Sequence, residues 1–154
     1  MAVIAVIAVV LSLIALGLSA WTAFRPAQSP AESVYDTGQQ TDAKKAICAA
    51  TDVVRRGVSL NTNLQSPGGG GDVTGSLAVA ANARLALSDG GLYLIARLDP
   101  AVPKELADAV KAFANTLLDI GAAATAGLPN TDPDQAARLR TADTQNATVA
   151  DLCK

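Results

Sequence analysis

The sequence contains no histidine, only 2 cysteines, and few aromatic residues, which make up 3% of its 154 residues. Without histidine the chain lacks the commonest general base and the commonest metal ligand of proteins. Two cysteines far apart in the sequence do not supply a structural zinc site, which takes four ligands. These absences exclude most metal-dependent and histidine-based catalysis, so we expect neither enzymatic activity nor a bound cofactor.

Charged residues are also scarce, at 17% of the chain, and they nearly balance at 12 basic and 14 acidic side chains. A protein that binds the phosphate backbone of nucleic acid needs a basic patch. Arg55 and Arg56 are adjacent, as are Lys44 and Lys45, so each pair points to different faces of a helix. We therefore predict solvated side chains here, with a phosphate head group bound at Arg55 and Arg56 as the alternative, and no nucleic-acid partner.

What the chain does have is a long uncharged run at its start. Residues 1–24 carry no charged side chain, and the first charge, Arg25, is followed by Pro26. A helix of this length, rising about 1.5 Å per residue, spans the roughly 30 Å hydrocarbon core of a bilayer. Trp21 and Phe24 lie near its end, where aromatic rings favour the interface. We predict that residues 1–24 are a single transmembrane anchor in the lipid bilayer.

A cleaved signal peptide is the alternative interpretation of this run. The apolar stretch exceeds the usual length of about 7–15 residues, and no basic region precedes it. A cleavage after Ala20 would also place the large Leu18 where a small residue is preferred. The retained anchor is therefore favoured.

Small residues recur at intervals of three and four along the predicted anchor, among them Ser12, Gly17 and Ser19. Such spacing lets transmembrane helices approach closely. An anchor that packs against nothing also uses alanine, so the pattern permits a membrane partner without requiring one.

The rest of the chain divides into a tether and one domain. Residues 25–40 contain two prolines and little periodicity, which is typical of a linker. From 41 to 154 the composition favours helices, because alanine is abundant and β-branched runs are absent. We predict an all-α fold, an up-and-down bundle of about four helices, with segments at 41–62, 73–98, 103–126 and from 132 onward.

Apolar spacing indicates which face of each helix is buried. The segment 103–126 has an unbroken apolar stripe, made of Leu106, Val110, Phe113, Leu117, Ile120 and Ala124. The other segments have shorter stripes. These are Ile47, Val54 and Val58 in 41–62, Leu77, Ala81, Leu85, Leu92 and Ile95 in 73–98, and Leu139, Ala142, Val149 and Cys153 in the last segment. Gly90-Gly91 interrupts the 73–98 segment and permits a kink or two shorter helices.

Helix-start signals mark the last segment. Asp132 is a potential N-cap, Pro133 suits the first turn, and Gln135 stands where a capping box has its second member.

The cysteines lie at the two ends of the predicted bundle. Cys48 is early in the first helix and Cys153 is the next-to-last residue. In an up-and-down arrangement of four helices these positions lie at the same end, so the pair can bond if the Cα atoms come within about 7 Å. The alternative is two free buried thiols in a cytosolic domain. We favour the disulfide, which places the domain outside the cytoplasm.

Two other features have simple interpretations. Residues 66–76 are rich in glycine but lack the strand and the Gly-Lys-Ser/Thr ending of a phosphate-binding loop, so we predict a flexible connection between helices. Asn82 and Arg84 lie in a segment of alanine and leucine. We predict that they occupy an exposed edge of their helix, with a buried polar anchor or a contact to a partner as the alternatives.

Short motifs follow the anchor and the tether in a fixed order, namely Ile47-Cys48-Ala49-Ala50, Val58-Ser59-Leu60-Asn61-Thr62-Asn63, the alanine-rich run 81–87, and Asp151-Leu152-Cys153. This order of parts resembles a family of alanine-rich, single-pass envelope proteins of mycobacteria and related actinobacteria. The chain departs from that pattern in its extended glycine loop and in lacking a charged cytoplasmic region before the anchor.

The resemblance implies a small accessory protein of the cell envelope. Some proteins of this kind attach to large inner-membrane assemblies such as the Mce-type lipid importers, and the family supplies no catalytic residues. We therefore expect a non-enzymatic subunit of a larger integral-membrane complex in the bacterial inner membrane, with its C-terminal domain on the periplasmic side. The alternative is a helical bundle that binds a lipid or another small ligand between its helices.

Overall fold

The computed structural model describes residues 34–154, which form four α-helices, one short 3-10 helix and no strand. The all-α prediction is thus confirmed for this part of the chain. The elements are α2 (Thr37–Thr62), η1 (Gly69–Gly71), α3 (Val73–Arg97), α4 (Lys104–Thr125) and α5 (Pro133–Leu152). In the described range no helix is both long enough and apolar enough to cross a membrane. The predicted anchor, with Ser12, Gly17 and Ser19, lies outside that range, as does most of the predicted tether.

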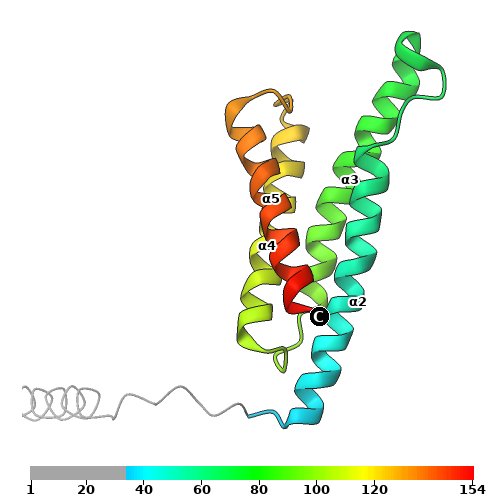
Figure 1. The fold of residues 1–154 in the computed structure, drawn as a ribbon. Coiled ribbons are helices and arrows are strands. Elements are labelled where there is room, and N and C mark those ends of the chain that lie inside the picture. The colour runs from blue at the N-terminus through cyan, green and yellow to red at the C-terminus, as the bar shows by residue number, and fades with distance from the viewer. Residues whose placement is uncertain (1–33) are drawn as a thin grey trace, which may run out of the picture. The chain divides into compact units, whose positions relative to one another are not determined.

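The helices pack as two antiparallel hairpins, α2 with α3 and α4 with α5 (Figure 1). Each helix packs along the next one in the chain, and the α3–α4 contact joins the hairpins. The first and last helices, by contrast, have few contacts with each other. The predicted up-and-down order is present, but the bundle is open between α2 and α5.

Helix α2 begins at Thr37, inside the stretch interpreted as a tether, because a capping box lies there. The backbone N–H of Gln39 donates to Asp36 Oδ1 at 2.8 Å, and the N–H of Asp36 donates to Gln39 Oε1 at 3.0 Å. Two otherwise unpaired donors at the helix end are thereby satisfied. The signal was present in the sequence as an Asp followed three residues later by Gln.

The core follows the predicted faces of α2, α4 and α5. Ile47 and Val54 are buried on α2, and Ala142 and Val149 on α5. The predicted stripe of α4 is buried from Leu106 to Ile120. Several core positions are alanine, each of which removes little apolar area from water, so the core gains much of its stability from these few larger side chains.

The predicted buried face of α3 is wrong. Leu77, Leu85 and Leu92 are 64%, 57% and 57% exposed, and Ile95 is 41% exposed. Ala81 is exposed as well. The residues that α3 buries are instead Leu87, Gly90, Gly91 and Leu94. Because α3 is apolar on several sides, spacing alone does not select the buried one, and the face with small residues is the one that packs against its neighbours.

Gly90 and Gly91 do not break α3, which is one continuous helix from Val73 to Arg97. They allow close packing with both neighbours. A Cβ on Gly90 would lie 2.8 Å from Val54 Cγ1 of α2, and one on Gly91 would lie 2.7 Å from the backbone oxygen of Ala114 in α4. The missing side chains therefore set how near α3 comes to α2 and α4.

The glycine-rich connection between α2 and α3 is a structured turn. Asp72 caps α3, because its Oδ1 accepts the N–H of Gly75 at 2.8 Å and its Oδ2 accepts the hydroxyl of Ser66 at 2.7 Å. Gly69 adopts a positive φ of 70°, which glycine tolerates without steric cost. The connection is an inter-helix loop as predicted, but specific hydrogen bonds define its path.

The Asp72 cap makes the start of α3 sensitive to acid. The hydrogen bond from Gly75 and that from Ser66 lower the pKa of the Asp72 carboxyl from its usual value. A lowered pKa stabilises the folded turn above the unfolded pKa of about 3.9, and this contribution disappears as the pH falls through the folded pKa. We therefore expect Asp72→Asn to speed hydrogen exchange at the Gly75 and Ser76 amides at pH 5 relative to the wild type, with the difference shrinking as the pH falls below the unfolded pKa. A difference that does not change with pH would contradict this account.

Helix α5 starts as predicted, with Asp132 as N-cap and Pro133 in the first turn. The role of Gln135 differs from the predicted one. Its side chain is fully buried and donates from Nε2 to the backbone oxygen of Ile120 at 3.1 Å instead of returning to the cap. Gln135 thus connects the first turn of α5 to the backbone of α4 through a buried hydrogen bond.

Candidate functional site

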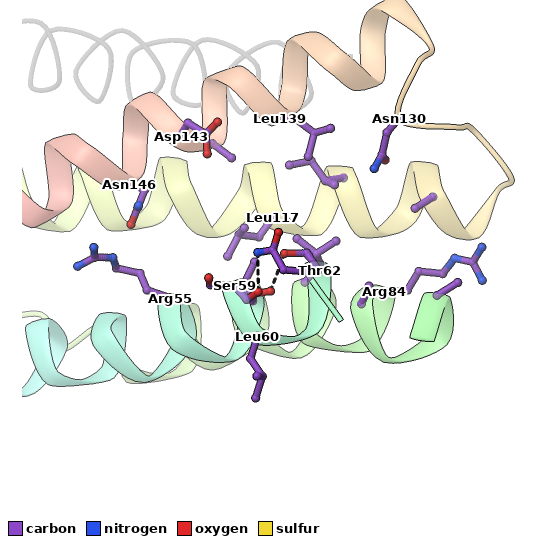
Figure 2. A pocket seen from close by; sticks show the side chains of 18 of the residues that line it. Arg55, Ser59, Leu60, Thr62, Arg84, Leu117, Asn130, Leu139, Asp143 and Asn146 are labelled. Carbon is purple, nitrogen blue, oxygen red and sulfur yellow. Dashed lines mark hydrogen bonds between the residues drawn. The ribbon is translucent and has the colours of Figure 1, made fainter. Parts of the chain in front are cut away.

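The opening between the two hairpins forms a cleft of about 1310 Å³. Its walls come from the second half of α2 and from α5, and α3 and α4 lie between them (Figure 2). The cleft exists because α2 and α5 diverge while each remains packed on its own hairpin partner.

The deepest side chains of the cleft are apolar. The large and almost wholly buried side chains among them are Leu87, Phe113, Leu117 and Ile120. On the α5 wall, Leu139 is partly buried and Ala142 is small and buried. Leu117 and Leu139 come from α4 and α5 and face the cleft in Figure 2. A floor of this kind favours a hydrocarbon group over a hydrated one.

Charged side chains surround this floor. Arg55, Arg56 and Arg84 line the cleft, together with Asp52 and Asp143. Arg55 and Arg84 lie at opposite ends of it (Figure 2). The Arg55 guanidinium donates to Asp52 Oδ1 at 3.3 Å, and both side chains are substantially exposed, so this ion pair contributes little to stability. Neither Arg56 nor Arg84 has an ion-pair partner among the described residues.

An unsatisfied acceptor lies on the α5 wall. Asn146 lines the cleft, and its Oδ1 is buried without a hydrogen-bond partner. Figure 2 places Asn146 across the cleft from Arg55, at the same end. Buried polar atoms are nearly always hydrogen-bonded in folded proteins, so this oxygen, like Oε1 of Gln145, leaves an acceptor unused.

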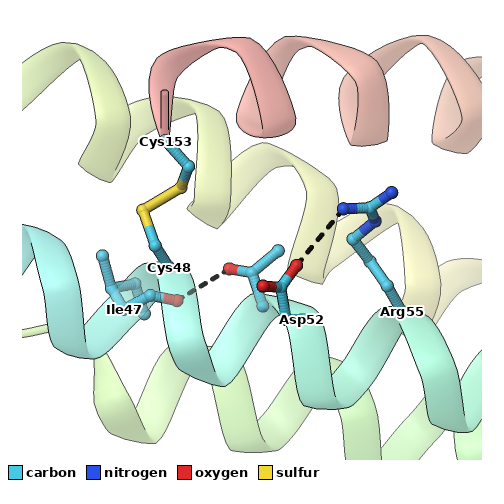
Figure 3. Close-up of a disulfide and its surroundings, with 6 residues drawn as sticks. Ile47, Cys48, Asp52, Arg55 and Cys153 are labelled. Atoms are coloured by element: carbon cyan, nitrogen blue, oxygen red, sulfur yellow. Dashed lines mark hydrogen bonds and ion pairs between the residues drawn. A yellow bond between two sulfur atoms is a disulfide. The ribbon is translucent and has the colours of Figure 1, made fainter.

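The predicted bond between Cys48 and Cys153 is present, with their Cα atoms 5.7 Å apart (Figure 3). The alternative of two free thiols is therefore wrong, since the described chain has no free cysteine. The disulfide joins α2 to the end of α5, two helices that otherwise scarcely touch. Cys48 precedes Asp52, a cleft residue, by one helical turn, so the bond lies near the Asp52 end of the cleft, although neither cysteine lines it.

A second feature is the side of α3 that the sequence predicted to be buried. We call Leu77, Ala81, Leu85, Leu92 and Ile95 the outer face of α3. None of them lines the cleft, and all are exposed. The five residues lie along one side of α3, where Ser88 and Asp89 stand between Leu85 and Leu92. Sequence spacing identified these residues correctly as a group but assigned them to the core.

No group of three or more potential metal ligands occurs within residues 34–154. The cleft itself was not predicted. Arg55 and Arg56 were interpreted as solvated and Arg84 as an exposed helix edge, and all three line it. The signal available was Arg84, a charged residue in a stretch of α3 that is otherwise rich in alanine and leucine.

The sequence matches no protein-family model, and comparison with curated proteins and with solved structures found nothing similar to this chain.

Proposed function

We propose that this protein is a non-enzymatic accessory subunit of a larger integral-membrane complex, and that it docks on that complex through the outer face of α3. The observation that carries the proposal is the exposure of this face: Leu77, Leu85, Leu92 and Ile95 together leave a stripe of large apolar side chains in contact with water. Contiguous apolar patches of this kind mark interaction sites in soluble domains, whereas single exposed leucines do not.

The surroundings of the stripe support a protein partner. The outer face lies on a helix held on its other sides by α2 and α4, so it is presented rigidly. A rigid apolar helix surface binds with little loss of conformational freedom, and burying it removes apolar area from water. A complementary apolar helix surface of the host complex is the partner that this chemistry favours.

The location and the host belong to the same proposal. The uncharged run 1–24 supports a membrane anchor, and the Cys48–Cys153 bond fits an oxidising compartment, on the periplasmic side of the bacterial inner membrane. The resemblance to actinobacterial envelope proteins favours a lipid-transport assembly of the Mce type as the host. In that role the subunit stabilises or coordinates the assembly.

We expect charges on the outer face to release the protein from its host. The double variant Leu85→Glu, Leu92→Glu should lose at least tenfold in co-purifying complex, because two carboxylates would have to be desolvated at the interface. The measurement is tag purification of the full chain from native membranes in a gentle detergent, followed by quantification of each co-purifying protein.

The matched control is Leu60→Glu, Leu64→Glu, which places the same charges on two exposed leucines near the end of α2. Leu60 lines the cleft and is not part of the outer face of α3 (Figure 2). This control should retain the complex, and circular dichroism should show that both variants are folded. Equal loss in the two variants, or no loss in either, would refute docking through the outer face of α3.

A further inference from the structure

We propose that the cleft binds a single-chain anionic lipid, with a charged, hydroxyl-bearing head at Arg55 and Asn146 and the hydrocarbon chain along the apolar floor. This site is separate from the proposed docking surface, because no residue of the outer face of α3 lines the cleft.

The dimensions of the cleft suit a long-chain molecule. Its volume of about 1310 Å³ is larger than the roughly 300–1,000 Å³ of typical small-molecule pockets. Along α2 its lining extends from Asp52 to Asn63, a distance of about 17 Å at the rise of an α-helix. The cleft is therefore an elongated trough, and its apolar floor runs along its length through Phe113, Leu117 and Ile120.

The charges at the rim select an anion. Arginines outnumber aspartates by three to two among the lining residues. The only aspartate that pairs with one of these arginines is Asp52, which is itself well exposed, so Arg55 keeps donors free for a ligand. A guanidinium presents five N–H donors in a planar fork and binds phosphate and carboxylate groups in bidentate fashion.

Asn146 adds a requirement on the head group. Its buried Oδ1 has no partner and accepts a hydrogen bond, so a ligand that places a hydroxyl there satisfies it. A carboxylate alone offers no donor. A glycerol-containing phospholipid with one chain offers both the anionic phosphate for Arg55 and a hydroxyl for Asn146, which are on opposite walls at one end of the cleft.

The test uses two single-chain lipids that both carry glycerol hydroxyls and differ in the anionic phosphate. Lysophosphatidylglycerol and monoacylglycerol, each with a diazirine near the end of the acyl chain, are added in turn to the full chain in phosphatidylcholine nanodiscs. After illumination, mass spectrometry locates and quantifies the labelled peptides. We expect labelling within 113–124 and 139–146, and about tenfold more of it with the anionic head, which is the effect of one charge-assisted hydrogen bond.

Three variants assign the effect to the cleft. Arg55→Gln should reduce labelling by lysophosphatidylglycerol about tenfold, to the level of the uncharged monoacylglycerol. Ser59→Trp should abolish labelling by both lipids, because Ser59 is exposed on the α2 wall and an indole there fills the trough. Lys111→Gln, which removes an exposed charge of α4 outside the cleft, should label like the wild type.

Equal labelling by the two lipids, or labelling only outside the cleft peptides, would overturn the proposal. The same holds if Arg55→Gln and Lys111→Gln label alike. Such results would leave docking through the outer face of α3 untouched, since its own variants test that face separately.

Discussion

The double variant Cys48→Ala, Cys153→Ala should lose about 4 kcal/mol of unfolding free energy, the largest effect we expect from any small change in this chain. The disulfide closes a loop of 105 residues, and in the chain-entropy model a loop of this length restricts the unfolded state by about 4–5 kcal/mol. For a domain of this size the melting temperature should fall by roughly 10–20 °C. Thermal unfolding of the full chain followed by circular dichroism measures this.

The loss of stability should be largest at one part of the fold, the end of α5. Because α2 and α5 touch little apart from the disulfide, the end of α5 should open first, and Val149 and its neighbours should exchange amide hydrogens faster than the middle of α4. Reduction of the wild-type disulfide is the matching control and should reproduce the pattern. A melting temperature unchanged by both treatments would mean that helix packing alone holds the two hairpins together.

Gly91→Ala should destabilise the protein by about 2 kcal/mol, although alanine is the better helix former. The added Cβ would lie 2.7 Å from the backbone oxygen of Ala114 and 2.7 Å from Leu118 Cγ. The backbone oxygen cannot rotate away, so α3 and α4 must separate and lose contact along their length. Chemical denaturation of the full chain, compared with the wild type, measures the loss.

Gly57 provides the matched control, because it is also a glycine inside a helix. A Cβ at Gly57 meets no atom within 4 Å. Gly57→Ala should therefore stabilise the protein by about 0.5–1 kcal/mol through the reduced entropy of the unfolded chain. Opposite signs for the two glycines confirm that close helix packing, and not helix propensity, explains Gly91. A gain at both positions would contradict the packing of α3 against α4.

The sequence predicts the buried side of some helices better than that of others. In α4 one face is apolar from Leu106 to Ile120 and the other is polar, so periodicity alone identified the buried side. In α3 both Leu85 and Leu87 are apolar, and the choice between them was made by the tertiary contacts of Gly90 and Gly91. From the sequence alone, two adjacent glycines in a helix predict a kink. They are a packing surface here because another helix lies against them.

The candidate site was less predictable than the fold. The disulfide followed from the order of the helices, because an even number of antiparallel helices returns the chain to the end where it began. The cleft did not, since it depends on the divergence of α2 from α5, which no local pattern specifies. Arg55 and Asn146 come from opposite ends of the domain sequence and share a cleft only through that tertiary arrangement.

Site-specific crosslinking in native membranes tests the central claim, docking through the outer face of α3, most directly. A photoreactive amino acid is placed at Leu92 on that face or, as the control, at exposed Leu60 on α2. The account predicts that Leu92 crosslinks to one integral-membrane protein and that Leu60 does not. Crosslinking to the same proteins from both positions, or to none from Leu92, would contradict it.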